Sequence, residues 1–198
     1  MNKQDIISFF NALAPTWDSG TIKEKDKIKK IFDLGDISEN CKVLDVACGT
    51  GVLISDYIDR KVKSITGIDI SPAMIKIAKE KFSSFSDVSF VCGDIESAAF
   101  EEKFDRVMIY NAFPHFSNPE NVIENIAGLL SSGGRLTVAH NMGIEELEKH
   151  HSTIKADVSK RLPEADEMEK LFQPYFETDV KISEKDIYIV SGVKKKQL

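Results

Sequence analysis

The sequence predicts an α/β fold, a doubly wound and mostly parallel sheet of seven strands that finishes with an antiparallel hairpin. Short apolar segments alternate with helix-length segments through the middle of the chain, which is typical of parallel strands joined by helices. Two expected helices open with a capping residue followed by proline, at Ser71-Pro72 and Asn118-Pro119. Near the end of the chain, two strand-like segments are joined by residues 183–185, which predicts the hairpin.

Each element follows from a local pattern. Residues 4–13 place apolar side chains on one helical face, and Pro15 ends that helix. A capping box at Thr21 and Glu24 is expected to open the next helix, which ends at Gly35. The expected strands are 42–47, 64–70, 88–92, 104–110, 135–140, 178–182 and 186–193, and the expected helices are 4–13, 21–34, 51–58, 71–82, 118–130, 144–161 and 165–172.

Length and composition narrow the class of protein. The chain has 198 residues, which suits a single domain, and 26 basic against 32 acidic residues give a net charge of −6. An acidic surface disfavours nucleic acid and anionic membranes as partners. Cys41, Cys48 and Cys92 cannot all pair and match no zinc spacing, which indicates a reducing compartment. Without a span-length apolar run or a secretory start, we expect a cytoplasmic protein.

The most informative segment is the glycine loop after the first expected strand, residues 43–51. Gly49 and Gly51 allow a tight turn and a close approach of the backbone to a ligand. The third glycine of a dinucleotide-binding fingerprint is missing, because residues 53–54 are leucine and isoleucine. Asp45 would repel a pyrophosphate but suits a cationic ligand.

Acidic residues also end the next two expected strands. Asp69 follows Gly51 by 18 residues, the position from which an acid binds ribose hydroxyls. Asp94 ends the third strand, where it can accept a hydrogen bond from an adenine amino group while Ile95 covers the ring. Each acid alone is more often a helix cap, but three acids at successive strand ends beside a Gly-x-Gly loop form a more specific pattern.

Together these segments resemble the successive motifs of class I S-adenosylmethionine-dependent methyltransferases, especially the ubiquinone/menaquinone-biosynthesis-type branch. Residues 10–18 also look like the N-terminal lid segment of that branch, and the terminal hairpin fits its reversed last strand. The resemblance implies a Rossmann-like methyltransferase fold and covers roughly residues 9–140. The motifs that carry it are 43–51, 67–74, 93–94, 104–107 and 129–136.

The resemblance implies a site for S-adenosylmethionine, the methyl donor. Gly49 and Gly51 would approach its methionine part, with Asp45 near the ammonium or sulfonium side. Asp69 would hold the ribose hydroxyls. The donor site implied as a whole consists of Asp45, Ala47, Gly49, Gly51, Asp69, Ile70, Met74, Asp94, Ile95, Asn111 and Trp17. Trp17 has an equally good second interpretation as a packing anchor of the first helix.

The same resemblance divides the single domain, 1–198, into four parts. We expect N-terminal lid helices over 1–35, a donor-binding core over 41–140, acceptor-side helices over 141–175 and a terminal hairpin over 176–198.

The acceptor should lie past the fourth and fifth strands. Phe113, Phe116 and Met142 predict an apolar pocket for a small-molecule acceptor. Methyl transfer from a sulfonium needs mainly alignment and exclusion of water. A base is required only when the acceptor atom carries a proton.

All four histidines fall within the window 115–151, on this acceptor side. Three interpretations stay open: solvent-facing or capping residues, a general base at His115 or His140, and a divalent metal site. The metal site would use His115, His140 and one of His150 and His151, with an acid such as Glu146 or Asp18.

The function we expect is therefore methyl transfer to a small molecule, with a divalent metal as an optional second cofactor. One alternative is a non-catalytic protein that senses S-adenosylmethionine. A nicotinamide-dependent oxidoreductase is a further alternative, which the missing third glycine disfavours.

Overall fold

The computed structural model describes residues 2–20, 23–152 and 158–196, with the backbone alone for 150–152. Its centre is a seven-stranded sheet in the order β3-β2-β1-β4-β5-β7-β6. The first five strands pair in parallel, whereas β7 is antiparallel to both β5 and β6. The predicted fold class is confirmed. The strands are β1 (Lys42–Val46), β2 (Ser64–Asp69), β3 (Val88–Cys92), β4 (Phe104–Tyr110), β5 (Leu130–His140), β6 (Phe176–Ser183) and β7 (Tyr188–Lys194).

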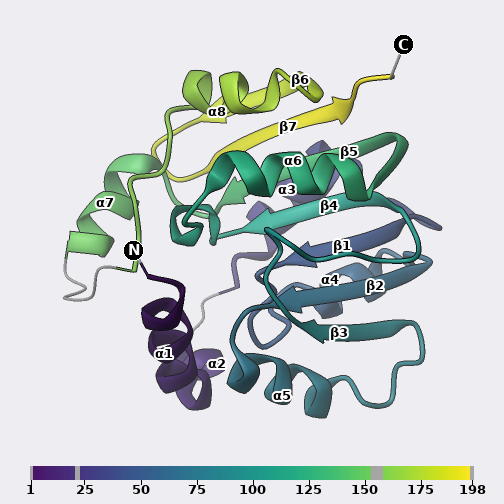
Figure 1. The fold of residues 1–198 in the computed structure, drawn as a ribbon, viewed down its shortest axis with the longest axis vertical. Helices are drawn as coiled ribbons and strands as arrows, with labels where there is room; N and C mark the ends of the chain where they lie inside the picture. Colours follow the sequence, from purple (N-terminus) through teal and green to yellow (C-terminus); the bar gives the residue numbers. More distant parts are fainter. Residues whose placement is uncertain (1, 21–22, 153–157, 197–198) are drawn as a thin grey trace.

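Helices cover both faces of the sheet (Figure 1). One face packs against α3, α4 and the end of α5, and the other packs against α6 and α8. In the described part of the chain, no helix is long and apolar enough to cross a membrane. The helices are α1 (Lys3–Leu13), η1 (Ala14–Thr16), α2 (Trp17–Gly20), α3 (Lys25–Leu34), α4 (Ile54–Asp59), α5 (Pro72–Lys81), η2 (Phe113–His115), α6 (Pro119–Leu129), α7 (Ile144–Ser152) and α8 (Ala165–Phe172).

Strand β1 shows why both faces are buried. Its side chains alternate, so that Leu44 and Val46 belong to the core under α6 and α8, while Val43 belongs to the core under α3 and α4. Asp45 shares the side of Val43 and therefore points towards Tyr57 of α4. A continuous apolar run with one acid near its end is thus explained by a central strand that carries one buried carboxyl group.

The cap-and-proline starts are confirmed. The Ser71 side chain accepts the backbone N–H of Met74, and Asn118 accepts that of Asn121. The predicted capping box at Thr21 and Glu24 is wrong for Glu24, which is itself the N-cap residue and makes no side-chain cap. Thr21 lies outside the described residues.

Several predicted boundaries differ from the structure, and three of the differences have a clear local cause. Helix α4 begins at Ile54, because the glycine loop continues as turns through residue 53. Strand β5 begins at Leu130 and takes in the glycines that were predicted as a turn, at the cost of a register shift against β4. Residues 158–161 are not helical as predicted, since the Lys160 N–H donates to the Pro114 carbonyl instead of to a helical partner.

The strand order indicates that the candidate site lies at the carboxyl ends of the parallel strands. The parallel strands β1, β2 and β4 point towards the side where α1, α2 and α7 lie (Figure 1). The strand order reverses between β1 and β4, and ligands of doubly wound sheets bind at such a switch point.

Candidate active site

A cavity of about 730 Å³ opens at this switch point. Its walls come from the loops that follow β1 to β5, from α1 and α2, and from the start of α7. The size lies within the range of small-molecule sites. The predicted donor-site residues that line the cavity are Asp45, Ala47, Gly49, Asp69, Ile70, Met74, Asp94, Ile95, Asn111 and Trp17.

The two loop glycines have different surroundings. Gly49 lines the cavity with φ +56°, and a Cβ atom there would lie 3.5 Å from Trp17 Nε1. Gly51 has φ +84° and does not line the cavity, because it packs against Phe82, whose ring would lie 2.7 Å from an added Cβ. Ala47 also has a positive φ, +55°, which concentrates backbone strain in this loop. Gly51 thus belongs to the side of the loop that packs against Phe82, away from the cavity.

Asp69 joins two of the cavity loops through its carboxylate. One oxygen accepts the backbone N–H of Gly49 at 2.9 Å, and the other accepts that of Ser71 at 2.8 Å. Burial raises the pKa of Asp69, and the two N–H groups partly offset this rise. Each carboxylate oxygen keeps a second lone pair, so the group can still accept two hydroxyl donors.

Asp45 lies at the base of the cavity and is 2% exposed. Burial raises the pKa of Asp45 to about 8, with a smaller contribution from the charge of Asp69. The Tyr57 hydroxyl donates to Asp45 at 3.4 Å and opposes part of that rise. A cation bound beside Asp45 would favour its ionised form.

Asp94 and Ile95 form the far end of the cavity, after β3. One Asp94 oxygen accepts the backbone N–H of Glu96 at 2.9 Å, and the other accepts the Lys3 ammonium at 2.6 Å. Lys3 also pairs with the Glu96 carboxylate at 2.8 Å. The N-terminal helix therefore supplies a cation to the loop that was predicted to hold adenine.

Asn111 and Asn141 link the loops after β4 and β5. The Asn111 amide nitrogen donates to Asn141 Oδ1 at 2.9 Å, and Asn111 Oδ1 accepts the Asn141 backbone N–H at 3.0 Å. Asn111 has φ +53°, a left-handed conformation that asparagine tolerates better than most residues. This pair links Asn111, which was predicted to contact the donor, to the loop after β5.

His115, which was predicted to lie on the acceptor side, lines the cavity. Its Nδ1 is 2.7 Å from the Val158 carbonyl oxygen, and its ring meets Phe10 edge-on with 5.0 Å between the ring centroids. A carbonyl can only accept, so Nδ1 carries the hydrogen in this contact. Nε2 is consequently the basic nitrogen of the neutral ring.

His140, the other histidine whose side chain the structure describes, does not join His115 at the cavity. His140 is 1% exposed, packs against the Tyr188 ring and does not line the cavity. The side chains of His150 and His151 lie outside the described residues. Within the described part of the chain, no three His, Cys, Asp or Glu side chains are grouped so that they could hold a metal ion.

The apolar pocket is confirmed only in part. Phe116 and Met142 line the cavity as predicted, whereas Phe113 is buried in the core under α6. The contributions of Lys3 and Asn11 were not predicted. Lys3 contacts Asp94 and Glu96, and Asn11 contacts Ser71 and Ala73. These partners are 60 to 93 positions away in the chain, so no local sequence pattern predicts them.

The strand order and the glycine loop define the fold of S-adenosylmethionine-dependent methyltransferases. A family model described as a methyltransferase domain matches residues 37–180, and the chain belongs to that family.

Three relatives illustrate the similarity. A malonyl-[acyl-carrier protein] O-methyltransferase of Acetivibrio thermocellus is 31% identical over 161 residues, which cover 78% of this chain and 56% of the relative. The ubiquinone/menaquinone biosynthesis C-methyltransferase UbiE of Campylobacter jejuni is 28% identical over 155 residues, 70% of this chain and 64% of the relative. The chain thus spans between about half and two thirds of these two proteins. The N-methyltransferase NodS of Bradyrhizobium japonicum, solved with S-adenosyl-L-homocysteine, has a TM-score of 0.76 at 14% identity, with 97% of this chain and all of NodS covered.

Proposed function

We propose that this protein transfers a methyl group from S-adenosylmethionine to a small-molecule acceptor. The observation that carries the proposal is the cavity, where ten of the eleven residues predicted for the donor site come together from separate loops. Membership of the methyltransferase-domain family supports the reaction class. The relatives named above methylate at oxygen, carbon or nitrogen, so their names alone do not select an acceptor.

The cavity residues fit this donor. Asp69 keeps two acceptor positions for a pair of ribose hydroxyls, and the left-handed Gly49 leaves space that a side chain would fill. The buried Asp45 suits the cationic part of the donor. When bound, the sulfonium supplies an activated methyl group. The chain itself has to bind the donor, orient it and exclude water.

The acceptor side combines an apolar wall with one base. Phe10, Phe116, Met142 and Leu147 line the same cavity as His115, which favours an acceptor with an apolar body. We assign the base to Nε2 of His115, whose orientation is held by the Val158 carbonyl and the Phe10 ring. It would take the proton of an acceptor such as a phenol or a thiol. The proposal includes neither His140 as base nor a metal, since the described residues do not bring such ligands together.

Calorimetric titration with S-adenosyl-L-homocysteine tests the donor site, and methylation assays with quinols, catechols, thiols and amines test the reaction. We expect micromolar binding and a methylated product from a phenol or thiol. An absence of binding at millimolar ligand would overturn the proposal. Binding without product across the panel would favour the sensor alternative, and a thermal shift with nicotinamide nucleotides alone would favour the oxidoreductase.

A further inference from the structure

Residues 158–162, which we call the strap, lie against η2 and lead towards α8 (Figure 1). The strap belongs to no helix or strand. Val158 and Leu162, at its two ends, are each 1% exposed. Irregular backbone that is buried at both ends has to find partners for its polar groups outside itself. Three hydrogen bonds of the strap reach residues 114–117, around His115.

Two of these hydrogen bonds come from Lys160 and reach the backbone on both sides of His115. The Lys160 backbone N–H donates to the Pro114 carbonyl at 2.8 Å, and the Lys160 ammonium donates to the Ser117 carbonyl at 2.7 Å. Helix η2 is only three residues long, and the carbonyls at the end of a helix have no partner within it. Lys160 therefore supplies partners that η2 cannot provide for itself.

The third hydrogen bond reaches the His115 ring. Its acceptor is the Val158 carbonyl, 2.7 Å from Nδ1 and two residues before Lys160 in the strap. This carbonyl belongs to the backbone, so its position depends on how the strap lies against η2. The two bonds of Lys160 fix that position, because they join the strap to the residues that flank His115.

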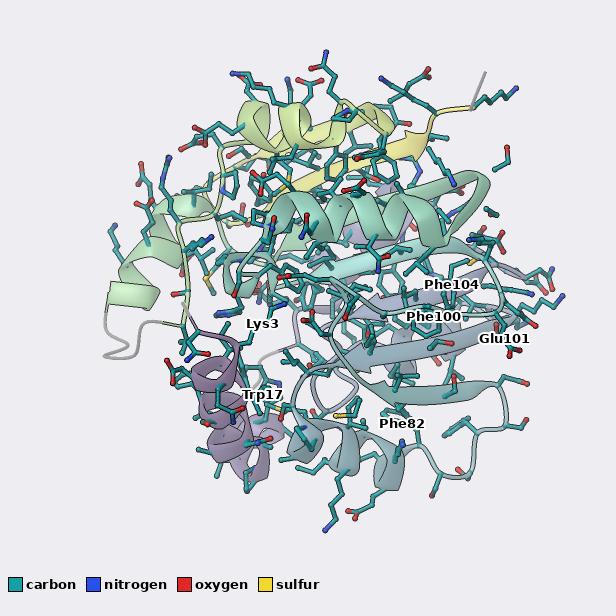
Figure 2. The ribbon with its side chains drawn as sticks, in the orientation of Figure 1. Lys3, Trp17, Phe82, Phe100, Glu101 and Phe104 are labelled. Atoms are coloured by element: carbon teal, nitrogen blue, oxygen red, sulfur yellow. The ribbon has the colours of Figure 1, made fainter. Side chains whose placement is uncertain are left out.

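The Phe10 ring contacts His115 as well, but it does not select the protonated nitrogen. Phe10 lies on α1, and Figure 2 shows Lys3 and Trp17 from the same N-terminal segment on the side that faces the sheet. An aromatic ring restricts rotation of the imidazole and is at most a weak acceptor. The Val158 carbonyl accepts a full hydrogen bond, so it favours the ring that carries its proton on Nδ1.

We propose that Lys160 is a positioning residue for the base. By fixing the strap to η2, Lys160 holds the Val158 carbonyl against Nδ1 of His115, and Nε2 keeps the lone pair that takes a proton from the methyl acceptor. When Nε2 takes that proton, the ring becomes a cation, and its bond to the Val158 carbonyl becomes charge-assisted and stronger. This inference rests on the proposed function, because it concerns the base assigned there.

The first test measures the tautomer of His115 in the protein without any ligand. In ¹⁵N-labelled protein at about pH 9, where an ordinary histidine is neutral, long-range ¹H–¹⁵N correlations distinguish the protonated ring nitrogen from the other. The signals of His115 are assigned by their absence from His115→Gln. The wild-type ring should carry its proton mainly on Nδ1.

Three variants of Lys160 grade the effect. Lys160→Met removes the ammonium contact and should lower the ratio of the Nδ1–H to the Nε2–H tautomer about threefold. Lys160→Pro also removes the backbone N–H and should lower the ratio further, up to about tenfold, which is the limit set by the loss of one neutral hydrogen bond. Lys160→Arg keeps a cationic donor and should stay near the wild-type ratio.

Arg161→Met is the matched control on the strap, with the same loss of charge. Arg161 Nε donates to Glu148 of α7 at 2.9 Å, which directs this side chain to α7 and not to η2. The pair is exposed and contributes little stability, so the tautomer ratio should not change. Thermal unfolding midpoints of Lys160→Met, Lys160→Arg and Arg161→Met should agree closely with the wild type, which separates positioning of the ring from general stability.

The second test compares two kinds of methyl acceptor. For a phenol, which has to lose a proton, kcat should fall about threefold in Lys160→Met and recover in Lys160→Arg. For a carboxylate, which carries no proton at neutral pH, kcat should stay at the wild-type value. The affinity for S-adenosyl-L-homocysteine should stay unchanged in both variants.

Four results would overturn the role of Lys160 while leaving methyl transfer as the proposed reaction. They are a wild-type ring protonated mainly on Nε2, an unchanged ratio in both Lys160→Met and Lys160→Pro, an equal change in Arg161→Met, and an equal fall of kcat for phenol and carboxylate. Failure of the wild type to bind S-adenosyl-L-homocysteine would instead overturn the proposed function, whereas the tautomer measurement needs no ligand.

Discussion

The carboxylate of Asp69 accepts the backbone N–H of Gly49, and this contact joins the end of β2 to the glycine loop after β1. Two residues that the family resemblance assigns to different parts of the donor are thus bonded to each other. A change at Asp69 therefore alters both the expected ribose contact and the shape of the glycine loop.

Asp69→Asn should lower the affinity for S-adenosyl-L-homocysteine at least tenfold. The amide can present only one oxygen, so either Gly49 or Ser71 loses its acceptor, and the charge-assisted bonds are lost as well. Isothermal titration calorimetry measures the change. Asp59→Asn is the matched control, because Asp59 is exposed at the end of α4. Equal affinities in the two variants would contradict the assignment of Asp69.

Asp45 should make the protein less stable as the pH rises. Its pKa is raised in the folded state to about 8, from an ordinary value near 4, so between these values the folded state holds a proton that the unfolded state releases. The free energy of unfolding should fall across this window, by at most about 1.4 kcal/mol per pH unit for one proton. Urea unfolding at pH 5 and pH 8 measures the slope.

Asp45→Asn should flatten that slope, since asparagine does not titrate and keeps an oxygen for the Tyr57 hydroxyl. Asp59→Asn again serves as the control and should retain the wild-type slope. An identical pH dependence in Asp45→Asn would show that other groups cause it.

Gly51→Ala should destabilise the protein more than Gly133→Ala. Both glycines have a positive φ, +84° and +74°, so both substitutions strain the backbone by about 1 kcal/mol. At Gly51 the new Cβ also meets the Phe82 ring at 2.7 Å, whereas nothing lies within 4 Å at Gly133. We expect a further loss of about 1–3 kcal/mol at Gly51. Urea denaturation compares the two, and equal losses would refute the packing role of Gly51.

His115→Gln should reduce kcat about 10²- to 10⁴-fold for an acceptor that must lose a proton. Affinity for S-adenosyl-L-homocysteine should stay near the wild-type value, because His115 is assigned to the acceptor side. The measurement pairs steady-state kinetics on the best acceptor of the panel with calorimetry. An unchanged kcat would remove His115 as the base, while loss of ligand binding would indicate a structural role instead.

Much of the fold could be predicted because local patterns repeat along the chain. The bounds of β3 and β4 were predicted to the residue, and so were those of α8. The predicted boundaries were wrong where hydrogen bonds to a distant segment determine the backbone conformation. Residues 158–161 leave the predicted helix because Lys160 bonds Pro114, and β5 begins early because Leu130 pairs with Phe104 of β4 ahead of the register shift that contains the glycines.

The histidines show that the sequence predicts the position of a residue in the fold but not the direction of its side chain. Parallel topology correctly puts His115 and His140 at one edge of the sheet, but it does not say which way each ring points. His140 is the last residue of β5, where pairing with Tyr188 of β7 buries it. His115 follows β4 in a short helix, where its ring lines the cavity and contacts Phe10 from near the start of the chain.

By itself, the sequence determined where the candidate site residues lie on the sheet. The glycine loop and the three acids each fall at the carboxyl end of a parallel strand. That placement needs only hydrophobic periodicity and the rule that parallel strands end at one edge. Only the tertiary structure decided which side chains meet there, such as Lys3 with Asp94 and Asn11 with Ser71. The physical reason is that side-chain direction depends on packing partners many residues away, and local propensity carries no information about them.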